Sequence, residues 1–266
     1  MEFLKYIFYG IIQGLTEFIP VSSTAQLKII SLLFGIEDPG SSLSAIMQIG
    51  SVFAIFWYFR KSIFNFKNIN FKKQTYSFLP NKLYKSIFIG TIPIVFMGGI
   101  IKIFIPGFSD SFLRSNLSIA LVSLLMSLIM FFADISTNKL INLTNHKYRN
   151  SLYIGIAQAF AIIPGVSRSG VTISTALLFG WDRKEAAKFS FLLGIPAISL
   201  AAIVEFLCSV NQLSTFPFIP LFAGLITTFY FSLLAIDFLI NYVSSRGLKI
   251  FIYYRLIFGT LILLNL

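Results

Sequence analysis

Two apolar segments of this chain are each broken by a proline and followed by hydroxyl residues, and this feature restricts the fold more than any other. The first segment, Gly10–Gly35, contains Pro20 followed by the hydroxyl run Ser22–Thr24. The second segment, Gly155–Gly180, has Pro164–Gly170 (PGVSRSG) at the corresponding place. Non-helical backbone at membrane depth is tolerated only where it is buried in protein or lines a water-filled cavity. We therefore predict that both segments are re-entrant hairpins.

A constant offset of 145 residues relates the two segments, so they are predicted to be copies of one unit. Interrupted apolar segments at corresponding places in two halves are the best sequence indication of a binding site in a membrane protein. The residues that are identical at this offset include Gly10 and Gly155, Ile11 and Ile156, Gln13 and Gln158, Val21 and Val166, Ser22 and Ser167, and the runs Leu32–Gly35 and Leu177–Gly180.

The composition is typical of a membrane protein, since 56% of the 266 residues are hydrophobic and 12% are charged. Soluble domains carry about 25% charged residues. No removable signal peptide is expected, because no small-residue cleavage site follows Met1–Tyr9. A transmembrane helix needs about 20 apolar residues. The predicted spans are Leu43–Phe59, Leu83–Ile105, Leu117–Ile135, Ala186–Cys208, Phe218–Tyr242 and Lys249–Leu266.

The predicted fold class is an all-α polytopic membrane protein with an inverted-topology repeat. Each half is one re-entrant helical hairpin followed by three transmembrane helices, within a single membrane domain over residues 1–266; repeat one covers about 1–135 and repeat two about 151–266. Three spans are an odd number, so the second hairpin must enter from the opposite side, and the elbows meet near the midplane. The hairpins are predicted at Phe3–Ile19 with Ser22–Phe34 and at Leu152–Ile163 with Ser169–Phe179.

Membrane topology explains the net charge of +11 better than nucleic acid binding does. The basic residues fall in loops on one side of the six-span arrangement, above all in Arg60–Lys85, and such loops are cytoplasmic. Both chain ends and the entrance of the first hairpin are then outside. A lone cysteine, Cys208, excludes an intrachain disulfide. The lone histidine, His146, lies in a polar loop (Asn142–Asn150), which argues against a histidine-centred metal or acid–base site.

Glu17 is the strongest catalytic candidate, because a carboxylate in an apolar segment is costly and usually faces a cavity or a partner. Gln13 lies four residues earlier on the same helix face. The hydroxyl residues Ser22, Ser23 and Thr24 follow the proline. One of them is expected to cap the second half-helix, and another to bind or attack an anion held there. The alternative is a protonated or ion-paired Glu17 with a structural role.

The motif Pro164–Gly170 is predicted to bind phosphate. Its glycines allow close approach of the backbone, and successive N–H groups can form an anion-binding nest. Arg168 adds a guanidinium group that forks onto phosphate oxygens. The predicted substrate-binding residues in and after this motif are Ser167, Ser169, Gly170 and Thr172.

The other polar residues at membrane depth are weaker candidates. Gln48, in the first span, is predicted to reach the site as a substrate-binding residue. Glu205, Asp237 and Arg255 lie in the last three spans, where a structural ion pair with Arg255 is the preferred interpretation.

The motifs Gly14–Thr24 (GLTEFIPVSST), Pro164–Gly170 and Phe189–Leu193 (FSFLL) resemble those of the bacterial undecaprenyl-diphosphatase (undecaprenyl pyrophosphate phosphatase) family linked to bacitracin resistance. The resemblance covers nearly the whole chain, and motifs of this length are highly specific. It implies a multi-pass hydrolase of the bacterial inner (cytoplasmic) membrane, with its site open toward the periplasmic, outer face. That enzyme converts undecaprenyl diphosphate to undecaprenyl phosphate and inorganic phosphate, which recycles the lipid carrier for peptidoglycan synthesis, cell wall biogenesis and cell shape.

The same resemblance assigns roles to individual residues. It implies an acidic pair at Gln13 and Glu17, a candidate nucleophile at Ser23, and phosphate binding by Ser167, Arg168 and Thr172. The family usually has Gly-His after Ser-Ser-Thr, where this chain has Ala25 and Gln26. A histidine general base or nucleophile is therefore absent, and two interpretations stay open: Glu17 is the base, or this protein is slow or altered. Gln26 is retained as a predicted substrate-binding residue.

In the mechanism that we expect, Glu17 accepts a proton from Ser23, which attacks the terminal phosphorus. Arg168 neutralises the phosphates, with a divalent cation (Mg²⁺ or Ca²⁺) as a candidate cofactor and Glu17 as its candidate ligand; no organic cofactor is expected. The predicted partners are a polyprenyl diphosphate lipid and the bilayer, and no nucleic acid is expected. The sequence does not decide the oligomeric state, and a homodimer is one candidate. The alternatives are a polyprenyl-phosphate transporter or flippase, since inverted repeats with broken helices are common in transporters, and a non-catalytic lipid-carrier binder.

Overall fold

A computed structural model of the protein describes residues 2–36, 39–64, 81–105, 107–108, 111–136, 140–209 and 216–264. Within these ranges the regular structure is helical, and the β-bridge between Ile141 and Trp181 is the single exception. The first half comprises α1 (Glu2–Phe18), α2 (Ser23–Leu33), α3 (Gly40–Phe64), α4 (Asn81–Phe104), the 3₁₀ turn η2 (Phe112–Arg114) and α5 (Asn116–Ile135). The second half comprises α6 (Tyr148–Ala159), the 3₁₀ turn η3 (Phe160–Ile162), α7 (Arg168–Leu178), α8 (Arg183–Ser209), α9 (Phe218–Arg246) and α10 (Lys249–Leu264).

The predicted all-α polytopic class is confirmed. Five helices in the described ranges, α3, α4, α5, α8 and α9, are long and apolar enough to cross a membrane. The predicted sixth span, Lys249–Leu266, corresponds to α10, whose 16 residues end at Leu264, and residues 265–266 lie outside the described ranges. The helices extend several predicted spans by a few polar residues at their ends, because a helix continues beyond the apolar stretch that crosses the membrane.

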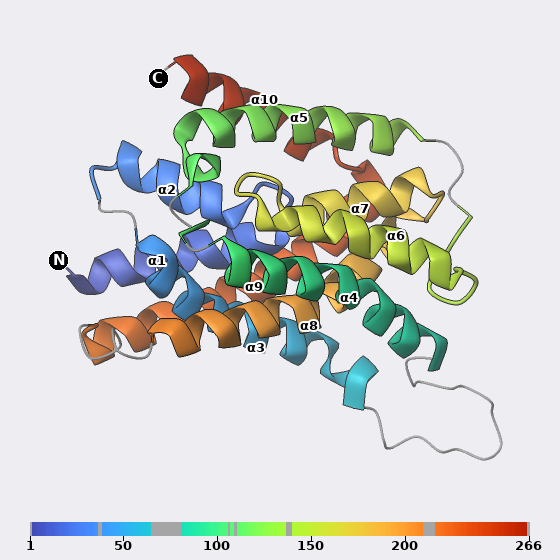
Figure 1. The fold of residues 1–266 in the computed structure, drawn as a ribbon, viewed down its shortest axis with the longest axis horizontal. Helices are drawn as coiled ribbons and strands as arrows, with labels where there is room; N and C mark the ends of the chain where they lie inside the picture. The colour runs from blue at the N-terminus through green and yellow to red at the C-terminus, as the bar shows by residue number, and fades with distance from the viewer. Residues whose placement is uncertain are drawn as a thin grey trace.

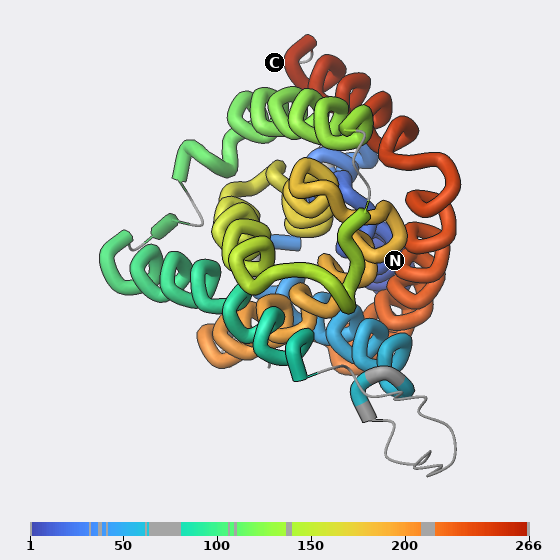
Figure 2. The backbone as a smooth tube through the Cα atoms, turned by 90° about the vertical axis from the view of Figure 1, so that its right-hand side faces the viewer, coloured from blue at the N-terminus to red at the C-terminus, as the bar shows by residue number. Residues whose placement is uncertain are grey.

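The two hairpins enter the molecule from opposite ends (Figure 1). The hairpin of α1 and α2 opens at the end where α10 finishes, whereas the hairpin of α6 and α7 opens at the other end. An end-on view places α6 and α7 in the middle of a ring of longer helices (Figure 2). This is the arrangement expected of an inverted repeat, although its orientation in a membrane stays a prediction.

Each hairpin packs mainly against a helix of the other half. Helix α1 contacts α9, and its counterpart α6 contacts α4, while α5 and α10 contact each other. Glycines allow the first two contacts: Gly10 lies against the carbonyl of Gly224, and Gly155 lies against the carbonyl of Gly90, where a Cβ atom would overlap with backbone. The site-bearing segments are thus held in place by the opposite repeat.

The basic helix ends gather at one end of the molecule, as predicted. The last turns of α3 and α9 and the first turns of α4, α6 and α8 lie on the right in Figure 1. These helix ends carry Arg60, Arg246, Lys82, Arg149 and Arg183. The middle of the predicted basic loop Arg60–Lys85 lies outside the described residues. This end of the molecule therefore has the charge expected of a cytoplasmic face.

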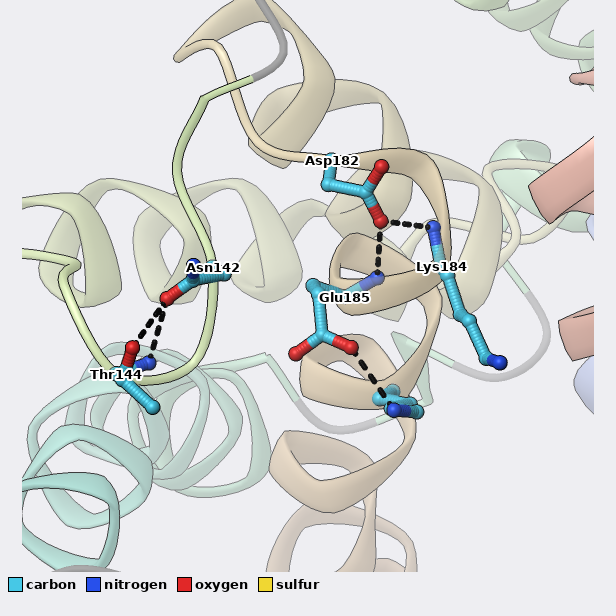
Figure 3. A network of polar contacts seen from close by, with 6 residues as sticks. Asn142, Thr144, Asp182, Lys184 and Glu185 are labelled. Atoms are coloured by element: carbon cyan, nitrogen blue, oxygen red, sulfur yellow. Dashed lines mark hydrogen bonds and ion pairs between the residues drawn. The ribbon is translucent and has the colours of Figure 1, made fainter.

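Side chains fix the loops at this basic end (Figure 3). Asp182 caps α8, since its Oδ1 atom accepts the N–H groups of Lys184 at 2.9 Å and Glu185 at 3.2 Å. Asn142 Oδ1 likewise accepts the N–H of Thr144 at 2.9 Å, which forms a tight turn in the loop before α6. Because α6 begins at Tyr148, the predicted loop Asn142–Asn150 is shorter than expected.

His146 is buried in this loop and has a structural role. Its Nε2 atom lies 2.7 Å from Ser86 Oγ of α4, and its ring packs against Trp181 and Phe189. Burial, with a smaller contribution from the charge of Lys82, lowers the pKa of His146 below its ordinary value of 6.5. The neutral imidazole therefore fastens the loop to α4 and α8.

The contact between α4 and α6 can be tested with two glycines of one helix. A Gly90→Val side chain would overlap with Ser151 and Leu193, and such overpacking costs about 1–3 kcal/mol. Gly98 faces open space, since a Cβ atom added to it would meet no atom of the described residues within 4 Å beyond its own stretch of helix, so Gly98→Val is the control. We expect thermal unfolding in detergent to shift to lower temperature only for Gly90→Val. Equal melting of both variants would contradict the glycine contact.

The burial of His146 predicts a pH-dependent stability. The unfolded histidine binds a proton near pH 6.5 and the folded one only at lower pH, so the free energy of unfolding should fall as the pH drops from about 7 to 5. His146 is the chain's single histidine, so His146→Gln should remove this component. Unfolding measured across that pH range checks the difference, and parallel curves for the two proteins would refute it.

Candidate functional site

The two hairpin elbows meet and share an unusual backbone conformation. Ser22 and Ser167, which correspond at the repeat offset, have φ angles of 72° and 67°, a region that non-glycine residues rarely adopt. Such strain persists only where surrounding contacts over-determine it, and it concentrates at functional sites. The hydroxyl of Ser22 accepts the N–H of Gly165 in the other elbow at 3.2 Å, while Ser167 Oγ caps α7 by accepting the N–H of Gly170 at 3.3 Å.

Arg255 of α10 forms hydrogen bonds to both elbows. Its guanidinium donates to the carbonyl of Pro20 in the first elbow at 3.2 Å, to the carbonyl of Gly165 in the second, and to the carbonyl of Ser123 on α5 at 3.4 Å. Pro20 and Gly165 also correspond at the repeat offset. Arg255 is 1% exposed, so each bond forms in a buried environment where an unpaired carbonyl would be costly.

This finding corrects the expected ion pair of Arg255. In the described part of the chain its three guanidinium nitrogens donate to carbonyls and not to Glu205 or Asp237. Asp237 instead accepts hydrogen bonds from Tyr58 at 3.1 Å and Asn241 at 3.2 Å. Glu205 lines a cavity near the end of α8 instead. The ion pair was expected because the three residues lie in consecutive spans, but that order along the chain does not decide which side chains meet.

Glu17 lies at the centre of a polar cluster supplied by the first half. Its Oε2 atom accepts the amide of Gln13 at 2.9 Å and the hydroxyl of Ser23 at 2.9 Å. Its Oε1 atom accepts the amide of Gln48 on α3 at 3.3 Å. Helix α1 carries the acid, the strained elbow returns Ser23 toward it, and α3 closes the cluster from the side.

Arg168 of α7 projects into the site from the second half. Its Nη1 atom donates to the carbonyl of Ser190 on α8 at 3.3 Å, whereas Nε and Nη2 are buried without a hydrogen-bond partner among the described residues. Gly194 makes room for the guanidinium, because a Cβ atom there would overlap with it. Buried donors without partners are uncommon in proteins, and an anion bound beside Arg168 would satisfy these two.

A cavity of about 270 Å³ contains both polar groups. Its lining includes Glu17, Ser22, Ser23, Thr24, Gln48, Ser167 and Arg168, together with apolar residues of α4, η3 and α8. A second cavity of about 210 Å³ shares Ser23, Thr24, Gln48 and Ala201 with the first. The second cavity extends toward Ser44, Arg114 and Glu205, which lie at the end of the molecule opposite the basic loops.

Most predicted site residues come together in these cavities, and several lie behind them. Thr172 supports the site, since its hydroxyl lies 2.6 Å from Ser190 Oγ and donates to the carbonyl of Arg168 at 2.8 Å. Gln26 faces α10, where its amide accepts the hydroxyl of Tyr254 at 2.6 Å. The predicted substrate-binding residues that do not line either cavity are Gln26, Ser169, Gly170 and Thr172. Direct substrate contact by these four stays a prediction.

Sequence reasoning missed the roles of Arg255, Ser190 and Gly194. Arg255 carried a signal, because a buried guanidinium always needs several acceptors, yet those acceptors are backbone carbonyls that leave no sequence pattern. Ser190 lies within the run Phe189–Leu193, but nothing in that run indicates contact with Arg168 and Thr172. The room that Gly194 leaves for Arg168 depends on the packing of α7 against α8.

The residues present fit a cation only if the substrate supplies part of the coordination. No group of three or more His, Cys, Asp or Glu side chains that could hold a metal occurs within the described ranges. Glu17 is the acidic residue of the larger cavity, beside amide and hydroxyl oxygens. Mg²⁺ commonly binds through one or two carboxylates plus substrate phosphates. Glu17 is thus compatible with that kind of site and not with a metal centre made by protein alone.

Sequence comparison places this arrangement in a family. The family described as "Bacitracin resistance protein BacA" matches residues 6–261. The chain belongs to this family. A protein of Prochlorococcus marinus subsp. pastoris named undecaprenyl-diphosphatase is 82% identical, and one of the same name from P. marinus strain MIT 9515 is 78% identical, with complete coverage of both chains in each case. A Synechococcus protein of that name is 44% identical over 96% of this chain and 91% of its own length.

Membership of the bacitracin resistance family confirms the resemblance on which the sequence analysis drew. The match covers both hairpins, both cavities and Arg255. The site described above therefore lies within the shared region of the family and not in an added segment.

Removing Arg255 should loosen the joined elbows. Arg255→Met leaves the buried carbonyls of Pro20 and Gly165 unpaired, at about 1–3 kcal/mol each, whereas the Ser123 carbonyl keeps its hydrogen bond within helix α5, so we expect a loss of unfolding free energy in detergent. Arg255→Lys should lose less, because an ammonium group can satisfy some of these acceptors but cannot fork. Arg149→Met, at an exposed position of α6, is the control. If Arg255→Met melts like Arg149→Met, the elbows are held by other contacts.

Proposed function

We propose that this protein is a membrane phosphatase that hydrolyses undecaprenyl diphosphate to undecaprenyl phosphate and inorganic phosphate. The observation that carries the proposal is the pairing, in one cavity, of the Glu17–Ser23 hydrogen bond with Arg168, whose buried donors have no partner in the described chain. A base beside a hydroxyl and a guanidinium group that seeks an anion suit phosphoryl transfer. The relatives at 82% and 78% identity carry the name of that activity.

In the proposed reaction, Ser23 is the nucleophile and Glu17 its general base. The Ser23 hydroxyl lies 2.9 Å from Glu17 Oε2, within the range for direct proton transfer. Oγ of Ser23 bonds to the terminal phosphorus, the bond to the bridging oxygen breaks, and undecaprenyl phosphate leaves. A water molecule then attacks the phosphoserine, and inorganic phosphate is released while Ser23 is regenerated. Gln13 and Gln48 hold the Glu17 carboxylate in position.

Arg168 binds the phosphate oxygens opposite this pair. Its Nε and Nη2 donors, which have no partner among the described residues, match the fork geometry that Arg uses for phosphate. A divalent cation, where present, would be held by Glu17 and by the substrate's own phosphate oxygens. Such a cation would supply further neutralisation of negative charge.

The second cavity supports an opening toward the outer face of the inner membrane. It leads from Ser23 and Thr24 to Glu205 and Arg114 at the end opposite the basic helix ends. Because the basic end is expected to be cytoplasmic, the polar route opens outside. Head groups would enter, and inorganic phosphate would leave, through this route.

Phosphate release from purified protein in detergent tests the function directly. Undecaprenyl diphosphate should yield inorganic phosphate without any membrane compartment, which a transporter or flippase would not do. Gln26→His, which restores the residue usual in the family, is run alongside to separate an impaired enzyme from an inactive binder. Absence of release from both proteins would exclude the phosphatase and favour a non-catalytic binder or a transporter.

Glu17→Gln should lower kcat by about 10²–10⁴-fold, the usual contribution of a general base, while the protein remains folded. Glu185→Gln is the matched control, since Glu185 is hydrogen-bonded at the α8 N-terminus and to Lys188 and lines neither cavity. Turnover is measured as phosphate release and folding as thermal unfolding. Wild-type turnover by Glu17→Gln would remove Glu17 from the role of base, and phosphate trapped on a residue other than Ser23 would reassign the nucleophile.

A further inference from the structure

The half of α4 that follows Pro93 stands apart from the helix bundle. The buried residues of α4 are Leu83, Ser86, Gly90 and Thr91, and all of them precede Pro93. A proline inside a helix removes one hydrogen bond and kinks the axis. In the end-on view the far end of α4 projects from the rest of the molecule (Figure 2). The first half of α4 is therefore locked against α6, and the second half diverges from it.

The divergence opens an apolar groove of about 440 Å³ between α4 and α6. Every residue that lines this groove is apolar, in contrast to the two polar cavities. The groove residues are Pro93, Phe96, Met97, Ile101, Phe108, Leu113, Ile156, Ala159, Phe160, Ile162 and Ile163. We refer to this surface as the α4–α6 groove.

The α4–α6 groove adjoins the cavity of about 270 Å³ that contains Glu17 and Arg168, here called the catalytic cavity. Ile162 and Ile163 line both of them. Ile94, the residue after the helix kink, lines the catalytic cavity from the α4 side. The two volumes are thus separated by a few aliphatic side chains, and a ligand with a charged end and an apolar end can occupy both.

We propose that the α4–α6 groove binds the isoprene units next to the diphosphate of the substrate. This inference rests on the proposed function, which places a diphosphate against Arg168 and Ser23. The tail of such a substrate must leave the catalytic cavity through an apolar opening, since exposing it to water is unfavourable. The second cavity is lined by Gln13, Ser44, Arg114 and Glu205, so it does not provide that opening.

The size of the groove limits how much of the tail is recognised. A volume of about 440 Å³ is in the range of sites for single small ligands, about 300–1,000 Å³. It accommodates the first few isoprene units, and the remainder of a long tail lies in the bilayer. The enzyme should therefore bind the start of a polyprenyl chain closely and respond weakly to its total length.

A bulky side chain in the groove should weaken substrate binding without changing the chemical step. Ala159→Phe fills the groove beside Ile163, so KM for farnesyl and undecaprenyl diphosphate should rise about 10-fold with kcat little changed. Inhibition by inorganic diphosphate, which has a head group and no tail, should stay at its wild-type value. Met97→Trp fills the same groove from α4 and should give the same pattern.

Leu152→Phe is the matched control, because Leu152 is an exposed residue of α6 that does not line the groove. The proposal is overturned if Ala159→Phe and Met97→Trp leave KM at the Leu152→Phe value. It is also overturned if inhibition by inorganic diphosphate weakens as much as KM rises, since the substitutions would then have damaged the head-group site.

Photocrosslinking tests the groove without turnover, so it separates failure of this inference from failure of the proposed function. A farnesyl diphosphate that carries a diazirine on its second isoprene unit should label α4 and the segment α6–η3, and undecaprenyl diphosphate should suppress the label. Labelling elsewhere would overturn the proposal. So would labelling of the groove by a diazirine phospholipid that undecaprenyl diphosphate does not displace, or cross-links through the groove that join two copies of the chain.

Discussion

One buried guanidinium group, that of Arg255, holds the two halves of the site together. It donates to carbonyls at corresponding positions of both elbows, Pro20 and Gly165, so neither elbow can move without breaking a bond to the same group. The bond from Gly165 N–H to Ser22 Oγ joins the elbows directly. Together these contacts stabilise the left-handed backbone of Ser22 and Ser167, which would be unfavourable in isolation. The candidate site lies at this junction, since Ser22 and Ser167 both line its cavity.

The two hairpins share a backbone but have diverged in chemistry. At the repeat offset, Ser23 of the first copy corresponds to Arg168 of the second, and Glu17 corresponds to Ile162. The first pair thus supplies a hydroxyl group in one copy and a guanidinium group in the other. In the second pair, Ile162 is part of the apolar wall between the catalytic cavity and the α4–α6 groove. The two elbows therefore have a similar backbone, and in the proposed function one supplies the proton acceptor and the other binds the anion.

Local patterns predicted the fold well and the supports of the site poorly. Five of the six predicted spans correspond to helices in the described ranges that are long and apolar enough to cross a membrane, because apolar length, proline and glycine act on the neighbouring backbone. Glu17, Ser23 and Arg168 were predicted as site residues because polar groups at membrane depth are conspicuous, and the structure places them in one cavity, while their catalytic roles stay a prediction. The bond network of Arg255, the space left by Gly194 and the burial of His146 depend on helices that are far apart in sequence. Gln26, taken as a substrate ligand from its position in a motif, faces Tyr254 instead of the cavity.

Each hairpin packs mainly against a helix of the other half of the chain, and this has a consequence for biosynthesis. Helix α1 ends at Phe18, and α9, against which it packs, begins at Phe218. At roughly 5–20 residues per second, the ribosome needs on the order of 10–40 s to make the intervening chain. During that time α1 carries Gln13 and Glu17 without the helix that will cover it. The first half therefore cannot reach its final packing before the second half is made.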